Sequence, residues 1–117
     1  MSNVEEFLSW FDEVYPGRSE ARDAVLAYGN ELLRVNPRLA LISKGDQGRF
    51  WTRHVQECIP GALVEDLENR ADLIDVGSGN GLPGILLAAL IPKLQVTLLE
   101  PRHKKVGFLD RVTYERE

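Results

Sequence analysis

The chain has 117 residues, of which 44% are hydrophobic and 27% charged, and its formal net charge is −4. These values fit one ordinary globular domain at most, which excludes a collagen-like, low-complexity or largely disordered chain. No run of about 18 apolar residues and no basic-then-apolar start is present, so we expect a cytoplasmic protein without a membrane partner.

The first two predicted elements are amphipathic helices. Ser2 and Asn3 are each followed three residues later by a glutamate, which is the spacing of a capping box. The first helix is therefore expected to begin there and to end at residues 15–17, Tyr-Pro-Gly. Ser19 can cap a second helix that stops at residues 36–37, Asn-Pro. We expect the apolar faces of both helices to form core.

The next stretch is less regular. Residues 38–43 are expected to be extended or irregular, and residues 44–48 to form a polar loop. A third helix is predicted from about Arg49 to Cys58, with one side formed by Phe50, Trp51, His54, Val55 and Cys58. The single cysteine cannot form an internal disulfide, which agrees with a reducing compartment, and we expect it to be a small buried hydrophobe.

From residue 62 onward the pattern changes to short apolar strands alternating with helices. The expected elements are a short helix or turn at 63–67, a strand at 71–76, a helix at 83–90, a strand at 95–100 and a helix at about 104–116. This order predicts a parallel sheet with right-handed crossovers, the opening half of a doubly wound α/β fold. We therefore divide the chain into an N-terminal helical region, 1–61, and the first βαβα part of an α/β domain, 62–117.

A glycine-rich turn follows the first strand. Asp75 precedes the run Gly77-Ser78-Gly79-Asn80-Gly81, in which backbone can approach a ligand closely. Amides at the start of the next helix would be free to face a polar group. The G-x-G-x-G spacing departs from the dinucleotide fingerprint G-x-G-x-x-G. It resembles motif I of class I S-adenosylmethionine-dependent methyltransferases. A tight turn without ligand and an NAD site are the alternatives.

A second acid follows the second strand. Glu100 comes 19 residues after Gly81, where its carboxylate can accept both hydrogen bonds of a ribose diol and repel the 2′-phosphate of NADP. Asp75 suits the ammonium of a methionine moiety. We assign S-adenosyl-L-methionine as the cofactor and expect no metal. The assigned cofactor-binding residues are Asp75, Gly77, Ser78, Gly79, Gly81, Leu82 and Glu100.

The charges are unevenly distributed along the chain. Residues 37–61 carry four bases against two acids, and residues 101–117 carry five bases against three acids. If these stretches met, they would form a basic face suited to phosphate contacts on an otherwise acidic body. The alternative is that the two stretches lie apart as two ordinary solvated faces, and the charge counts alone favour this alternative.

The sequence resembles the bacterial small-subunit rRNA methyltransferases RsmG, also called GidB, which methylate guanine N7 in 16S rRNA. The resemblance rests on the Trp-x-Arg-His pattern at 51–54, on 74–85, and on Leu98-Leu99-Glu100 followed by 104–109. It implies a Rossmann-like methyltransferase fold and 16S rRNA or the small ribosomal subunit as partner. It also places Arg53, His54 and Lys104 on the target side, as candidate catalytic or RNA-contacting residues.

The chain departs from the family in places. It has Arg-Leu-Ala at 38–40, where the family usually has Asn-Leu-Thr or similar, and Glu57-Cys58 where the family has Asp-Ser. Alternatives also remain for two site candidates. Arg53 can form a salt bridge with Glu57 at i+4, and His54 can be a partly buried histidine without a role in proton transfer.

The family continues for about as many residues again. A two-stranded sheet has uncovered edges and one uncovered face, so we expect the chain to be a fragment, or to self-associate through the open edge. The alternative to an enzyme is a non-catalytic truncated relative that acts as an S-adenosylmethionine-binding, RNA-binding or oligomerising module.

Overall fold

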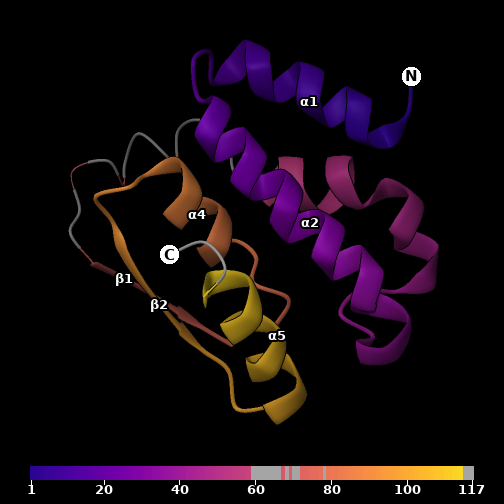
Figure 1. The fold of residues 1–117 in the computed structure, drawn as a ribbon, viewed down its shortest axis with the longest axis vertical. Coiled ribbons are helices and arrows are strands. Elements are labelled where there is room, and N and C mark those ends of the chain that lie inside the picture. Colours follow the sequence, from indigo (N-terminus) through magenta and orange to yellow (C-terminus); the bar gives the residue numbers. More distant parts are fainter. Residues whose placement is uncertain (59–66, 68, 70–71, 78, 115–117) are drawn as a thin grey trace.

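The computed structural model describes residues 1–58, 67, 69, 72–77 and 79–114 (Figure 1). Its helices are α1 (Asn3–Val14), α2 (Ser19–Leu39), the 3₁₀ segments η1 (Lys44–Arg49) and η3 (Gln56–Cys58), the π-helical η2 (Phe50–Val55), α4 (Gly84–Leu90) and α5 (His103–Tyr114). Its strands are β1 (Asp72–Val76) and β2 (Gln95–Leu99). Apart from Leu67, the short helix or turn expected at 63–67 lies outside the described residues.

The start of α1 confirms the predicted capping box. Ser2 Oγ accepts a hydrogen bond from Glu5 N at 3.2 Å, and Glu5 Oε1 accepts one from Ser2 N at 3.3 Å. The helix ends at Tyr15, and Gly17 follows with a φ of +77°, which fits the Tyr-Pro-Gly stop that the sequence predicted. Its buried side chains Phe7 and Phe11 form part of the core, as expected.

Asn3, the first residue of α1, also holds the segment at 50–52. Its Oδ1 accepts hydrogen bonds from Trp51 N at 2.9 Å and from Thr52 N at 3.3 Å. Its Nδ2 donates to Thr52 Oγ1 at 2.7 Å. A side chain from the start of the chain therefore satisfies two backbone donors near the N-terminus of η2.

The predicted end of the second helix was wrong. Helix α2 continues through Pro37 to Leu39, so residues 38–39, expected to be extended or irregular, are helical. The Asn36 side chain is buried and clamps the chain after the helix, since its Oδ1 accepts from Ile42 N at 2.8 Å and its Nδ2 donates to Ile42 O at 3.1 Å. These two buried bonds offset the unfavourable helical conformation of a residue that precedes proline.

Residues 44–58 also differ from the prediction. The expected polar loop is 3₁₀-helical, and the expected third helix is a wider π turn followed by a short 3₁₀ turn. Gln56 N donates to Trp51 O, which is the i to i+5 bond of a π-helix. The Trp51 ring lies directly over Gly29 of α2, where any Cβ would collide with it. The buried side of this segment is nevertheless the predicted one, with Phe50, Trp51 and Val55 in the core.

The two strands form the predicted parallel pair, in register from Asp72 opposite Gln95 to Val76 opposite Leu99. Both follow their sequence predictions to within one residue, and α4 and α5 start within one residue of theirs. One face of the sheet packs inward through half-buried side chains, whereas Ile74, Val76 and Leu99 are exposed on the other. Self-association through the sheet stays a prediction.

Helix α2 lies between the two halves of the molecule. Figure 1 places the sheet with α4 and α5 on one side of α2, and α1 with residues 44–58 on the other. Buried residues from both sides join one continuous core. Its largest fully buried side chains are Tyr28, Phe7, Phe11, Phe50, Leu32, Leu86, Leu87, Leu90, Val25 and Val55. Among the described residues, no helix combines the length and apolar character that a bilayer crossing requires.

Replacing Asn36 by alanine should lower the free energy of unfolding by about 2 kcal/mol, because Ile42 N and O would lose their partners in the interior. Urea unfolding of the full chain measures this change. The matched control is Asn30→Ala, at an exposed position of the same helix, which should change stability little. Equal losses in the two variants would contradict the clamp.

Candidate functional site

The glycine-rich turn follows β1 and is held to β2 by a backbone bond from Gly77 N to Leu99 O of 2.7 Å. Gly77, Gly79 and Gly81 have φ values of +71°, +55° and +98°, a region that other residues rarely adopt. A Cβ at Gly81 would lie 2.6 Å from Ile85 Cδ1, whereas one at Gly77 would meet nothing within 4 Å. The φ of Gly81 therefore favours glycine and a Cβ there would press on the end of the Ile85 side chain, whereas the Cβ position of Gly77 faces open space. Ser78 lies outside the described residues.

Asp75 lies on β1 and is bonded to the helix that follows the turn. Its Oδ2 accepts a hydrogen bond from Gly84 N at 3.1 Å. Partial burial raises the pKa of this carboxyl, and the bond from Gly84 acts in the opposite direction. Gly84 is needed for this close approach, since a Cβ there would lie 2.7 Å from Asp75 Oδ2 and 2.5 Å from Leu98 Cδ2.

Glu100 follows β2 directly and reaches across to the same turn. Its Oε1 accepts from Gly79 N at 2.8 Å, and its Oε2 accepts from Arg102 N and Arg102 Nε, each at 2.9 Å. The bond from the Arg102 side chain is the largest cause that lowers the pKa of Glu100 to about 2. The carboxylate is therefore ionised throughout the physiological range, as the recognition of hydroxyl donors requires.

Several amides of the turn already have acceptors in the chain. Besides the amides of Gly79 and Gly84, Leu82 N donates to Asn80 Oδ1 at 3.1 Å. The expectation that amides at the start of α4 would be free to face a ligand was therefore wrong for Leu82 and Gly84. The physical reason is that Asp75 and Asn80 are close enough to bond them. The carboxylates of Asp75 and Glu100 and the side-chain amide of Asn80 therefore hold the backbone of the turn in place.

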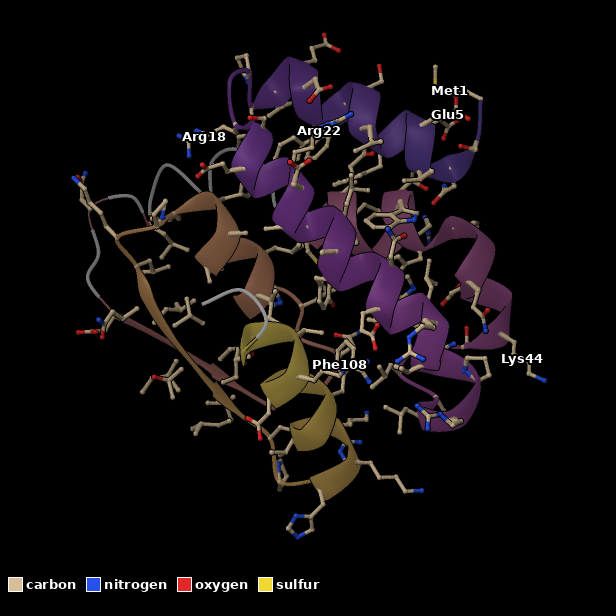
Figure 2. The ribbon with its side chains drawn as sticks, in the orientation of Figure 1. Met1, Glu5, Arg18, Arg22, Lys44 and Phe108 are labelled. Carbon is tan, nitrogen blue, oxygen red and sulfur yellow. The ribbon has the colours of Figure 1, made fainter. Side chains whose placement is uncertain are left out.

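Helix α2 also bonds to the turn and to α4, which the sequence analysis missed. The Tyr28 hydroxyl donates to Asn80 O at 2.7 Å, and Arg18 Nη1 donates to Leu90 O, at the end of α4, at 2.7 Å. Figure 2 shows Arg18 where α2 begins. Tyr28 falls on the apolar face of α2, so helical periodicity alone marks it only as core.

Arg53 and His54 lie on η2. Arg53 Nη1 lies 3.8 Å from Glu57 Oε2, and His54 Nε2 lies 3.2 Å from Asp46 Oδ2, with its ring stacked on Phe50. Within the described ranges, these side chains bond only to residues 46–57. The alternatives of an i+4 salt bridge for Arg53 and a partly buried histidine therefore match the geometry found.

The expected basic face is largely neutralised by local acids. Arg49 pairs with Asp46 at 3.1 Å, Arg111 of α5 lies 3.4 Å from Glu31 of α2, and Arg102 pairs with Glu100. Lys104, at the start of α5, is exposed and has no ion pair among the residues that the structure describes. The geometry agrees better with two solvated faces than with one basic surface.

The residues present fit the cofactor that the sequence suggested. Two acids at the carboxyl ends of neighbouring parallel strands face one turn, which is where ligands bind in open α/β sheets. The exposed backbone at Gly77 supplies room for close approach. A hollow of about 460 Å³ between β2 and α5 reaches Glu100 but is not lined by the turn glycines. It is therefore separate from the turn itself.

Comparison with known proteins gives consistent matches. A family profile described as "GidB: rRNA small subunit methyltransferase G" matches residues 22–117. Ribosomal RNA small subunit methyltransferase G of Thermobifida fusca is 45% identical over 84 residues, which are 71% of this chain and 34% of the relative. The proteins of the same name from Frankia alni and Moorella thermoacetica are 47% and 36% identical, over 62% and 73% of this chain and 27% and 35% of theirs. The chain spans about one third of the length of these relatives.

Replacing Gly84 by alanine should destabilise the chain by about 2 kcal/mol, because the new Cβ forces α4 away from Asp75 and Leu98. Urea unfolding measures the effect. Gly107→Ala is the matched control, since Gly107 lies in α5 with open space around its Cβ position. That change should leave stability unchanged or raise it by about 0.5–1 kcal/mol. A Gly84 variant as stable as the parent would contradict the close packing.

The lowered pKa of Glu100 predicts that the chain loses part of its folding stability in acid. The folded-state pKa of about 2 lies below the ordinary 4.5, so its contribution to stability is present above pH 4.5 and is lost as the pH falls toward 2. Glu100→Gln should therefore be less stable than the parent at pH 7, with a difference that shrinks between pH 4.5 and pH 2. The pKa of Asp75 is raised, so its effect on stability changes with pH in the opposite direction, but Asp75 is present in both the parent and the Glu100→Gln variant and its effect cancels in the comparison. Unfolding curves across this range provide the measurement, and a constant difference would refute the assignment.

Proposed function

Because the chain belongs to the family of rRNA small subunit methyltransferase G, we propose that it binds S-adenosyl-L-methionine as part of an enzyme that methylates guanine N7 in 16S rRNA. The observation that carries the proposal is that two carboxylates, those of Asp75 and Glu100, accept hydrogen bonds from backbone amides of the same turn. Asp75 bonds to Gly84 N at the end of the turn, and Glu100 bonds to Gly79 N within it. Neighbouring strands of one parallel sheet hold the two carboxylates.

The acids have different roles in this proposal. Glu100, ionised down to about pH 2, would accept hydrogen bonds from the ribose hydroxyls. Asp75 would attract the ammonium of the methionine moiety, whose positive charge favours the ionised form of a carboxyl that burial alone disfavours. Gly77, Gly79 and Gly81 would form the backbone against which the ligand rests, and Ser78 and Leu82 complete the proposed set.

The Arg102 side chain sets a condition on ribose binding. A carboxylate offers about four acceptor sites, and Glu100 already accepts from Gly79 N, from Arg102 N and Nε, and at 3.5 Å from Arg102 Nη2. A diol that bonds to Glu100 must therefore replace guanidinium bonds. This exchange requires the site to rearrange, because the Arg102 side chain is 64% exposed whereas the Glu100 side chain that it covers is 0% exposed.

The bound cofactor would supply an electrophilic methyl group on a sulfonium centre. Guanine N7 carries an in-plane lone pair and needs no deprotonation, so no residue of the chain is assigned as a general base. The contribution of the protein is to position the reactants and to exclude water. Arg53, His54 and Lys104 are proposed on the RNA side, where Lys104 and Arg53 are both exposed and Arg53 lies 3.8 Å from Glu57.

Isothermal titration of the full chain with S-adenosylmethionine, and with its demethylated product, tests cofactor binding. Asp75→Asn and Glu100→Gln should each weaken binding about tenfold or more, since each removes a charge-assisted contact. Asp72→Asn is the matched control, because it removes an exposed acid from the start of the same strand as Asp75.

Absence of heat with the parent chain would refute cofactor binding, and unchanged affinity in both site variants would refute the site. Methyl transfer to small ribosomal subunits separates the two functional classes. Transfer by the chain or by a longer version of it supports the enzyme, whereas cofactor binding without transfer by either supports the alternative of a non-catalytic binding module.

A further inference from the structure

Tyr28 connects the interior of the helical region to the glycine turn. It lies on the buried face of α2, is 1% exposed, and packs its ring against Phe108 of α5 with a centroid distance of 6.2 Å. Figure 2 shows Phe108 on the side of α5 that faces α2. Burial raises the pKa of the Tyr28 phenol well above its ordinary value, so the hydroxyl keeps its proton and remains a donor. Its acceptor is Asn80 O, at 2.7 Å.

That acceptor belongs to the peptide between Asn80 and Gly81, within the glycine turn. Asn80 stands between Gly79 and Gly81, both at positive φ. The orientation of the peptide between Asn80 and Gly81 is set by ψ of Asn80 and φ of Gly81, and glycine has few steric limits on φ, so the backbone alone fixes that orientation only in part. The peptide is planar and trans, and its C=O and N–H therefore point in opposite directions. Holding Asn80 O toward α2 directs Gly81 N–H away from α2.

We propose that Tyr28 is a positioning residue for the cofactor turn, and that its hydroxyl fixes the plane of the Asn80–Gly81 peptide in the orientation that binds S-adenosylmethionine. The inference rests on the proposed function for the identity of the ligand, while the hydrogen bond itself stands on the geometry. Two other bonds hold the neighbouring parts of the turn, from Gly79 N to Glu100 and from Leu82 N to Asn80 Oδ1. Among the residues that the structure describes, the bond from Tyr28 is the one that reaches the turn from the helical region.

Tyr28→Phe removes the hydroxyl and keeps the ring against Phe108, so it tests the bond with little change in packing. Hydrogen–deuterium exchange of the full chain should show the amides of residues 79–82 exchanging about tenfold faster than in the parent. Titration with S-adenosylhomocysteine should show Kd raised about tenfold. Val25→Ala, one turn earlier on the same buried face, is the control for a purely structural loss.

The control variant creates a cavity in the core and lowers global stability without touching the bond to Asn80. It should leave exchange at 79–82 and Kd within about threefold of the parent. Parent-like exchange in Tyr28→Phe would overturn the positioning role, and so would faster exchange with unchanged Kd. If the parent binds neither ligand, the proposed function fails, whereas the exchange measurement still decides whether Tyr28 holds the turn.

Discussion

The burial of helix α2 on both sides is the constraint on which the rest of the structure depends. On one side Gly29 leaves just enough room for the Trp51 ring, which brings residues 50–55 against the helix. On the other side Tyr28 packs against Phe108 and bonds to the glycine turn. Because both contacts occur at adjacent residues of one helix, the helical region and the βα unit have a single core. The packing of α2 therefore contributes to the stability of both parts of the molecule.

The candidate site is held by polar contacts from three different elements. Asp75 of β1 bonds to the amide of Gly84, Glu100 after β2 bonds to that of Gly79, and Tyr28 of α2 bonds to the carbonyl of Asn80. A glycine-rich segment has high conformational freedom, which opposes a fixed binding geometry. The three contacts restrict that freedom before any ligand arrives. The acids that recognise the cofactor in our proposal therefore also preorganise the backbone against which it rests.

The features predictable from sequence were those determined by nearby residues. The capping box of Ser2 depends on a partner three positions away, and the two strands and the glycine turn each have a local pattern of apolar residues and glycines, although their partners lie more than 20 positions away. The continuation of α2 through Pro37 was missed because the buried clamp to Ile42 has no signature in a helical pattern. The π turn at 50–55 and the Tyr28 bond were missed because their partners lie more than 20 residues away and become neighbours only in the folded chain.

Asn3 gives the beginning of the chain an influence that its exposed surroundings do not suggest. The same residue opens α1 and satisfies the amides of Trp51 and Thr52. Proteolytic removal of the first three residues, or a fusion tag that altered the first turn of α1, would therefore remove hydrogen bonds to Trp51 and Thr52, some fifty residues away. The ring of Trp51 is the one that packs against Gly29. The first turn of α1 therefore helps to hold the segment that carries Arg53 and His54.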